Sequence, residues 1–141
     1  LFLGKSGTGK STHTGLWLQQ FSDCHLLNDD NPIVHVDSLG KQATVFGSPW
    51  SGKTPCYRKE SMTVGAFVRL EQAPQNEIEQ ERAAHAFATL LPSCSCLKQN
   101  KEIYNAIVTT VTELATLAPV YHLKCLPDRE ATELCRKTVE G

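Results

Sequence analysis

The sequence lacks the features that mark several classes of protein. Its 14 basic and 15 acidic residues leave a formal charge of −1, so it has no basic excess to favour nucleic acid or an anionic membrane surface. Its apolar runs are too short to cross a bilayer, and no positively charged, apolar export signal precedes them. Repeats and low-complexity segments are also absent. These absences favour a cytoplasmic globular protein.

Six cysteines are present, but their arrangement does not indicate a disulfide framework. They are Cys24, Cys56, Cys94, Cys96, Cys125 and Cys135. A chain of 141 residues can bury a hydrophobic core without disulfide bonds. Cys94 and Cys96 are the only close pair, and neither a second pair nor a nearby histidine completes a zinc site. We expect reduced, mostly structural thiols.

The pattern of apolar segments and breakers predicts one α/β domain over residues 1–141, with helices covering a mixed sheet. Strands are expected at residues 1–3, 25–27, 33–37, 43–46, 64–70 and 120–125. Helices are expected at residues 11–21, 77–91 and 98–117, and from residue 127 onward. Residues 33–37 and 43–46 flank a glycine-containing turn and predict a β-hairpin. Because the chain opens at Leu1 without a methionine, we also expect residues upstream of it.

The segment after the first expected strand has the pattern of a phosphate-binding loop. It fits G-x-x-x-x-G-K-[ST] with Gly4, Lys5, Ser6, Gly7, Thr8, Gly9, Lys10 and Ser11. Glycines let backbone N–H groups wrap around a polyphosphate, and the following helix turns its positive end to the same place. Lys10 is expected to contact the β- and γ-phosphates and the Ser11 hydroxyl to bind Mg²⁺. The pattern predicts ATP or a close relative, with Mg²⁺, as the ligand.

A phosphate loop also needs a carboxylate for its metal, and a pair of aspartates is well placed to supply it. Asp29 and Asp30 follow the apolar residues Leu26 and Leu27, as expected for the end of a strand. One carboxylate would belong to the Mg²⁺ shell, and the other would accept a proton from an incoming hydroxyl. The alternative is a solvated turn, since the neighbouring residues are turn formers.

Residues 47–54 also fit the same pattern, but the chemistry argues against a second phosphate loop. Pro49 removes an amide donor and Trp50 brings bulk into the segment. Pro55 disfavours helical geometry at Thr54, so no helix is expected to begin there. The segment follows a strand, so two interpretations stay open. It is either a loop over the active site, in which Lys53 neutralises phosphate charge, or a rigid surface loop.

One histidine, His13, lies near the phosphate loop in the sequence. It falls on the first turn of the expected helix. Either it contacts the ligand or it is an ordinary core or surface histidine.

With these residues the sequence resembles the HPr kinase/phosphorylase and phosphoenolpyruvate carboxykinase group of phosphate-loop proteins. The resemblance rests on the segment from Gly4 to Thr12 and on Leu27-Asn28-Asp29-Asp30. The short interval between Lys10 and Asp29 leaves room for only one helix and one short strand. The resemblance implies a phosphate-loop fold, ATP binding along residues 4–12, and a paired aspartate. By that resemblance Asp29 would be the base and Asp30 the metal ligand, or the reverse.

The leading prediction is a Mg²⁺-dependent ATP phosphotransferase, a small kinase similar to the HPr kinases. Its acceptor would be a hydroxyl of a small molecule or of a protein. Carboxykinases carry a further domain for which this chain has no room, so that activity is less favoured. Two alternatives stay open: a nucleotide-sensing module that turns over slowly or not at all, and a simple ATPase.

Overall fold

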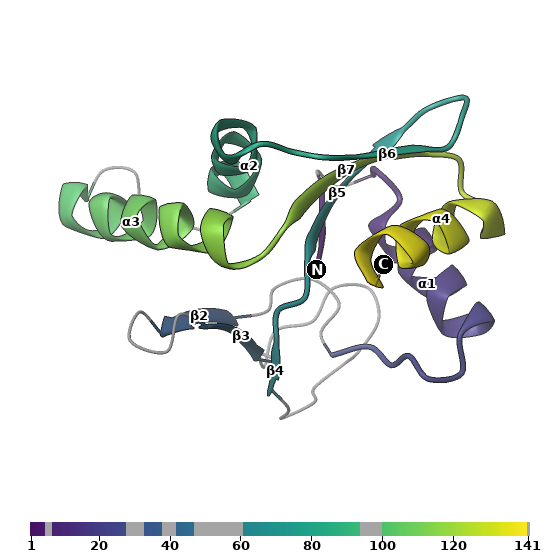
Figure 1. Ribbon diagram of the computed structural model, residues 1–141, viewed down its shortest axis with the longest axis horizontal. Coiled ribbons are helices and arrows are strands. Elements are labelled where there is room, and N and C mark those ends of the chain that lie inside the picture. The colour runs from purple at the N-terminus through teal and green to yellow at the C-terminus, as the bar shows by residue number, and fades with distance from the viewer. Residues whose placement is uncertain (5–6, 28–32, 38–41, 47–60, 94–99, 141) are drawn as a thin grey trace.

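The computed structural model describes residues 1–4, 7–27, 33–37, 42–46, 61–93 and 100–140 (Figure 1). Within these ranges the first half of the chain forms β1 (Phe2–Leu3), α1 (Lys10–Gln20), β2 (Ile33–Asp37), β3 (Gln42–Phe46) and β4 (Ser61–Thr63). The second half forms β5 (Phe67–Gln72), β6 (Glu77–Gln80), α2 (Ala83–Leu90), a 3₁₀ turn (Leu91–Ser93), α3 (Lys101–Leu117), β7 (Val120–Cys125) and α4 (Arg129–Glu140).

The main sheet has four strands in the order β1-β5-β7-β6. The first three are parallel to one another, and β6 is antiparallel to β7. Helices α1 and α4 lie on one side of this sheet, whereas α2 and α3 lie on the other (Figure 1). The predicted architecture, a mixed sheet with helices on its faces, is therefore confirmed.

Side chains of the central strands point alternately to the two faces of the main sheet, so the core has one cluster on each face. Val68, Leu70 and Leu123 pack with Cys135 of α4 and with Trp17 of α1. The residues that point the other way pack against α2 and α3, and the buried members of that cluster include Phe67, Val120, Ala86, Val111 and Leu114. Because successive strand residues face opposite sides, one sheet buries apolar side chains in two layers.

A second, three-stranded sheet lies below α3 in the order β2-β3-β4 (Figure 1). β2 and β3 are antiparallel, with Ile33 opposite Phe46 and Asp37 opposite Gln42, so the two strands of the predicted hairpin are confirmed. Its turn, at residues 38–41, lies outside the described residues. Ala43 and Val45 of β3 belong to the same buried cluster as the inner residues of α3.

The largest differences between the predicted elements and the structure lie in three segments. Residues 25–27 form no strand: the chain is irregular there, and Leu27 packs against the core without regular structure. The strand expected at residues 64–70 begins at Phe67, and Ser61–Thr63 pairs instead with β3. The helix expected at residues 77–91 begins only at Ala83, because Glu77–Gln80 forms β6 along the edge of β7.

Side-chain caps determine where α3 and α4 begin. The Asn100 carboxamide oxygen accepts hydrogen bonds from the backbone N–H groups of Glu102 and Ile103, at 3.1 and 3.2 Å. The Asp128 carboxylate accepts one from the N–H of Ala131 at 3.0 Å. Such caps satisfy amide groups that have no partner within the helix. Both helices therefore start slightly later than predicted.

Helix α1 is held against the sheet at its first turn and against α4 just after its last residue. Arg136 of α4 donates hydrogen bonds to both carboxylate oxygens of Asp23, at 2.9 and 2.6 Å, and its guanidinium lies 4.4 Å from the centre of the Phe21 ring. In the first turn, His13 is only 3% exposed and lies edge-on to Phe2 at 4.9 Å between ring centres. These contacts fix the helix that follows the predicted phosphate loop.

Free thiols are present at Cys24, Cys125 and Cys135, and the other three cysteines lie outside the described residues. Burial raises the pKa of the Cys135 thiol to about 12. No helix in the described part of the chain has the length and apolar character needed to cross a membrane.

His13 is a core residue whose burial links stability to pH. The indole N–H of Trp17 donates to His13 Nε2 at 3.0 Å, and burial lowers the pKa of His13 to about 4. Between about pH 6.5 and this value, the histidine takes up a proton in the unfolded chain but not in the folded one.

We therefore predict that the free energy of unfolding falls as the pH is lowered from about 6.5 to about 4. The loss should reach roughly 1.4 kcal/mol per pH unit for this one group. His13→Gln should flatten that dependence in urea unfolding curves, whereas His35→Gln, at an exposed site, should leave it unchanged. The same slope in all three proteins would contradict the assignment.

Candidate functional site

Two glycines of the predicted phosphate loop have backbone conformations that other residues rarely adopt. Gly7 and Gly9 have φ angles of 90° and 94°, in the left-handed region that favours glycine. Gly9 is the N-cap of α1; no side chain caps this end, and the first turn holds no acidic residue. The positive end of the helix dipole therefore carries no carboxylate from its own first turn.

Close packing inside the loop constrains Gly4. A Cβ atom at this position would lie 2.5 Å from Thr8 Oγ1 and 3.3 Å from Thr8 Cβ. The Lys10 ammonium donates a hydrogen bond to the Gly4 carbonyl oxygen, across the loop. Gly4 is thus constrained by Thr8 and Lys10, and Lys5 and Ser6 lie outside the described residues.

A cleft of about 1170 Å³ opens beside the loop. The loop contributes Gly4, Gly7, Thr8 and Lys10 to its lining. The other walls come from the ends of β1 and β5 and from the α2 region, and include Arg69, Leu70, Glu71, Gln72, Glu81, His85, Ala88, Thr89, Pro92 and Ser93. The cleft is therefore bounded by the loop, a strand end and a helix.

Sheet register places the carboxyl end of β5 next to the loop. Leu3 of β1 pairs in parallel with Arg69, so both strands end at the same edge of the sheet. The Gln72 side chain donates to the Gly7 carbonyl oxygen at 3.2 Å. Open α/β sheets bind ligands at this edge.

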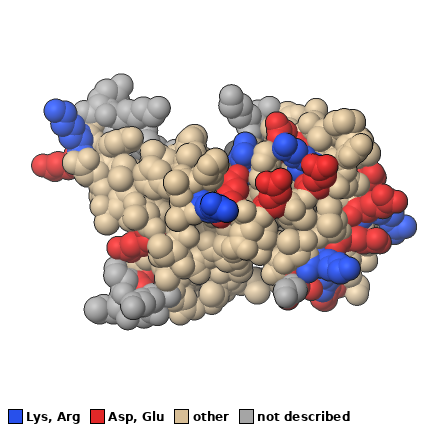
Figure 2. Space-filling model, turned by 45° about the horizontal axis from the view of Figure 1, so that its top comes forward, with Lys and Arg blue, Asp and Glu red and all other residues tan. Residues whose placement is uncertain are grey.

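Charged side chains form a connected network on the β5 wall of the cleft. Arg69 Nη2 lies 3.2 Å from Glu81 Oε1 and 3.2 Å from His122 Nδ1. The other ring nitrogen of His122 lies 2.7 Å from a carboxylate oxygen of Glu71. Thr89 donates its hydroxyl hydrogen to Glu81. On the face that Figure 2 draws, acidic and basic side chains likewise lie next to one another.

No protein-family model, curated protein or solved structure matches this chain.

The structure brings together only part of the predicted site. Lys10 lines the cleft with Gly4, Gly7 and Thr8, whereas Ser11 and Thr12 are exposed on the first turn of α1 and do not line it. Asp29, Asp30 and Lys53, together with residues 47–54, lie outside the described residues. Among the described residues, no group of three His, Cys, Asp or Glu side chains is arranged to hold a metal ion. His13 is buried and does not line the cleft.

Seven polar residues of the cleft were not among the predicted site residues: Arg69, Glu71, Gln72, Glu81, His85, Thr89 and Ser93. A partial signal existed, because Arg69, Glu71 and Gln72 fall at the end of an expected strand. Polar side chains at the carboxyl ends of parallel strands commonly line ligand sites. The strand order that sets β5 beside β1 was not available from the pattern alone.

The packing of Gly4 against Thr8 gives a direct test of the loop geometry. Gly4→Ala should lower the free energy of unfolding by about 1–3 kcal/mol, because the added methyl group overlaps the Thr8 side chain. Gly15→Ala is the matched control, since no heavy atom lies within 4 Å of its Cβ position and it sits inside α1. That control should gain about 0.5–1 kcal/mol. Equal effects in denaturant unfolding would show that the loop does not have this shape.

Proposed function

We propose that this chain binds a nucleoside triphosphate with Mg²⁺ at residues 4–12 and transfers the terminal phosphoryl group to a hydroxyl acceptor. It would be a small kinase of the phosphate-loop type, similar to the HPr kinases. The observation that supports the proposal most strongly is the cleft beside the loop. Gly4, Gly7 and Lys10 line this cleft together with residues at the carboxyl end of β5.

Phosphate binding follows from the loop and the helix behind it. Backbone N–H groups of the glycine-rich segment and the uncapped end of α1 favour an anion. Lys10 would exchange its contact with the Gly4 carbonyl for phosphate oxygens, because a charge-assisted hydrogen bond to phosphate is stronger than one to a neutral carbonyl.

The magnesium ion of the proposed site would be held by a few protein groups together with the substrate phosphates. Mg²⁺ keeps several waters and is usually bound through one or two carboxylates plus phosphate oxygens, so a closed protein cage is not needed. Ser11 would contribute its hydroxyl and Asp30 or Asp29 a carboxylate; Glu71, which lines the cleft, is a further carboxylate within the site. Bound there, the ion would neutralise charge on the phosphates.

The proposed reaction joins the acceptor oxygen to the γ-phosphorus and releases ADP. The acceptor hydroxyl would lose its proton to the aspartate that does not hold the metal, Asp29 or Asp30. Lys10 would stabilise charge on the transferred group. Lys53 would add a second positive charge if residues 47–54 cover the site. The remaining volume of the cleft, toward α2, would receive the acceptor.

Lys10→Ala should weaken Mg·ATP binding by at least about tenfold in calorimetric titrations, because it removes a charge-assisted contact to the phosphates. Lys53→Ala should weaken binding much less, since its segment is not expected to wrap the phosphates. Equal losses in the two variants would show that residues 47–54 bind the nucleotide as strongly as the first loop.

Turnover should depend on the aspartate pair. Asp29→Asn and Asp30→Asn should each slow Mg²⁺-dependent turnover by at least roughly tenfold, or about 1.4 kcal/mol of barrier, with the fold intact. Glu71→Gln is the informative comparison, because a comparable loss would assign part of the carboxylate chemistry to β5. Unchanged rates in both aspartate variants would contradict this role and favour the alternative, in which the two aspartates belong to a solvated turn.

Single-turnover measurements with labelled ATP separate the proposed kinase from its alternatives. Transfer of label to candidate hydroxyl compounds supports a kinase. Release of phosphate to water alone indicates an ATPase, and binding without either reaction indicates a nucleotide-sensing module. The last two results would each contradict the proposed reaction while leaving nucleotide binding in place.

A further inference from the structure

The β5 wall of the cleft carries an arginine whose presence the phosphate loop does not explain. Arg69 pairs with Leu3, the last residue of β1, and lines the same cleft as Lys10. Residues paired across parallel strands point to the same face of a sheet, so Arg69 lies on the face where the cleft opens. Its side chain is 41% exposed.

The described partners of Arg69 contact only one nitrogen of its guanidinium. Its contacts with Glu81 and His122 both involve Nη2. Nε is buried, and no described residue accepts its hydrogen bond. An arginine carries several N–H donors in a planar fork, and buried donors are normally satisfied. The guanidinium is therefore held through Nη2, and the partly exposed side chain keeps N–H donors that Glu81 and His122 do not use.

The carboxylate in direct contact with Arg69 holds this arginine in place. The Glu81 side chain is only 8% exposed, and its two oxygens receive Arg69 and the Thr89 hydroxyl. Glu71 is directed to His122, which contacts Arg69 through its other ring nitrogen. Both carboxylates are thus engaged with partners. A charged group fixed in this way needs little reorganisation to receive a ligand.

We propose that Arg69 is a second anion-binding residue of the cleft, which holds a phosphate or carboxylate oxyanion of a ligand. The chemistry suits arginine because its fork matches the geometry of both oxyanions. Two sources share this chemistry: the terminal phosphate of the nucleotide, or an anionic group on the acceptor. The inference rests on the proposed function only for the identity of the ligand that carries the anion.

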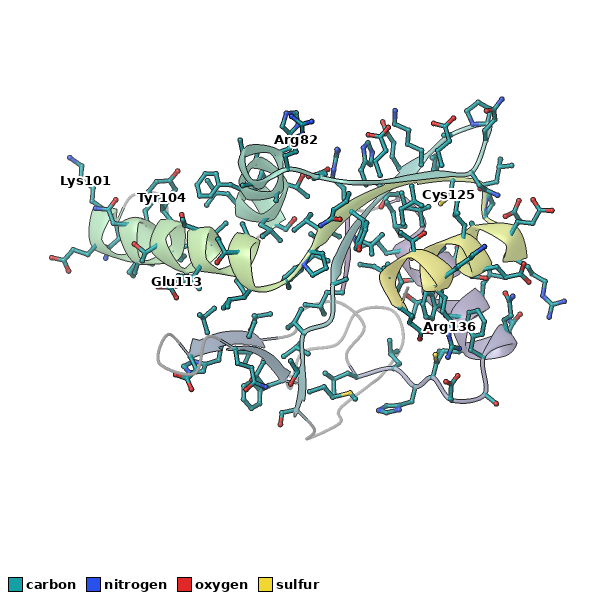
Figure 3. All side chains as sticks on the ribbon, in the orientation of Figure 1. Arg82, Lys101, Tyr104, Glu113, Cys125 and Arg136 are labelled. Atoms are coloured by element: carbon teal, nitrogen blue, oxygen red, sulfur yellow. The ribbon has the colours of Figure 1, made fainter. Side chains whose placement is uncertain are left out.

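The experiment uses inorganic phosphate as the probe and calorimetry on the full chain. Arg69→Met removes the charge but keeps most of the aliphatic stem. The double variant Arg69→Met with Glu81→Gln also removes the carboxylate that the single change leaves buried without its partner. Arg82→Met is the matched control, because Arg82 is exposed, follows Glu81 directly, does not line the cleft, and points away from the body at the top of α2 (Figure 3).

Phosphate affinity should fall at least about tenfold in the single and the double variant, and remain unchanged in Arg82→Met. A loss in the single variant that the double variant restores would overturn the inference, because Arg69 would then only neutralise Glu81. Unchanged phosphate affinity in both Arg69 variants would also overturn it, as would the absence of phosphate binding to the unaltered chain.

Two further titrations separate the sources of the anion. If Arg69→Met weakens Mg·ATP but not Mg·ADP, the residue holds the terminal phosphate. If both nucleotides bind normally but phosphate binds the Mg·ADP-loaded protein more weakly, it holds an acceptor anion. Failure of the unaltered chain to bind Mg·ATP would refute the proposed function, while an Arg69-dependent loss of phosphate binding would still support the anion site.

Discussion

Parallel pairing of β1 with β5 is the contact on which the rest of the site depends. β1 has only two residues, and its ladder is extended by a hydrogen bond of 2.8 Å from the Val68 N–H to the Leu1 carbonyl. This register makes the chain leave the sheet at Gly4 beside the end of β5. The Gln72 side chain at the end of β5 then donates a hydrogen bond to the Gly7 carbonyl oxygen in the loop. The loop, the start of α1 and the β5 wall are therefore placed together by a short stretch of backbone.

Aromatic packing under α1 supports the same arrangement from the other side. Phe2 contacts both His13 and Trp17, so the strand before the loop and the helix after it share one apolar cluster. His13 lies in the first turn of α1, which begins at Lys10. Its low pKa keeps it neutral, which suits a position between aromatic rings. The predicted loop is thus held at both ends by this cluster, of which Phe2 also lines the cleft.

Opposite charges on the cleft wall allow an arginine and two glutamates to coexist near a site proposed for anions. Buried Glu81 holds Arg69, and Thr89 occupies the second oxygen of Glu81. Removing one member of such a pair is costly, because a buried charge is left without its partner. The same network connects β5, β7 and the chain before α2, so it has a structural as well as a proposed binding role.

The local parts of this structure were predictable from the sequence, and the non-local parts were not. Glycines followed by Lys10 predicted a turn and then α1, in agreement with the φ angles of Gly7 and Gly9 and with the helix start, because turn conformation and helix start depend on nearby residues. The hairpin strands were predictable for the same reason. Glu77–Gln80 has helix-forming residues, yet it pairs with β7, whose partner residues such as Leu123 lie far along the chain. Tertiary pairing outweighs local propensity there.

The candidate site shows the same division. Lys10 and the glycines were identified from spacing, whereas Arg69 and Glu81 join the cleft only through strand order and the position of α2. Asp29, Asp30 and Lys53 lie outside the described residues, so their predicted roles stay predictions. A short sequence pattern predicts site residues that are contiguous in the sequence. It does not predict residues that reach the cleft from distant segments of the chain.

The central claim is that a nucleotide binds where the loop meets the end of β5. Backbone amide NMR resonances, followed during titration with Mg·ATP, test it most directly. The account predicts the largest shifts at Gly7, Thr8 and Gly9, with further shifts at Gln72 and little change at the exposed residues of α3. Saturable shifts confined to residues outside the loop and the β5 end, or none at all, would contradict it.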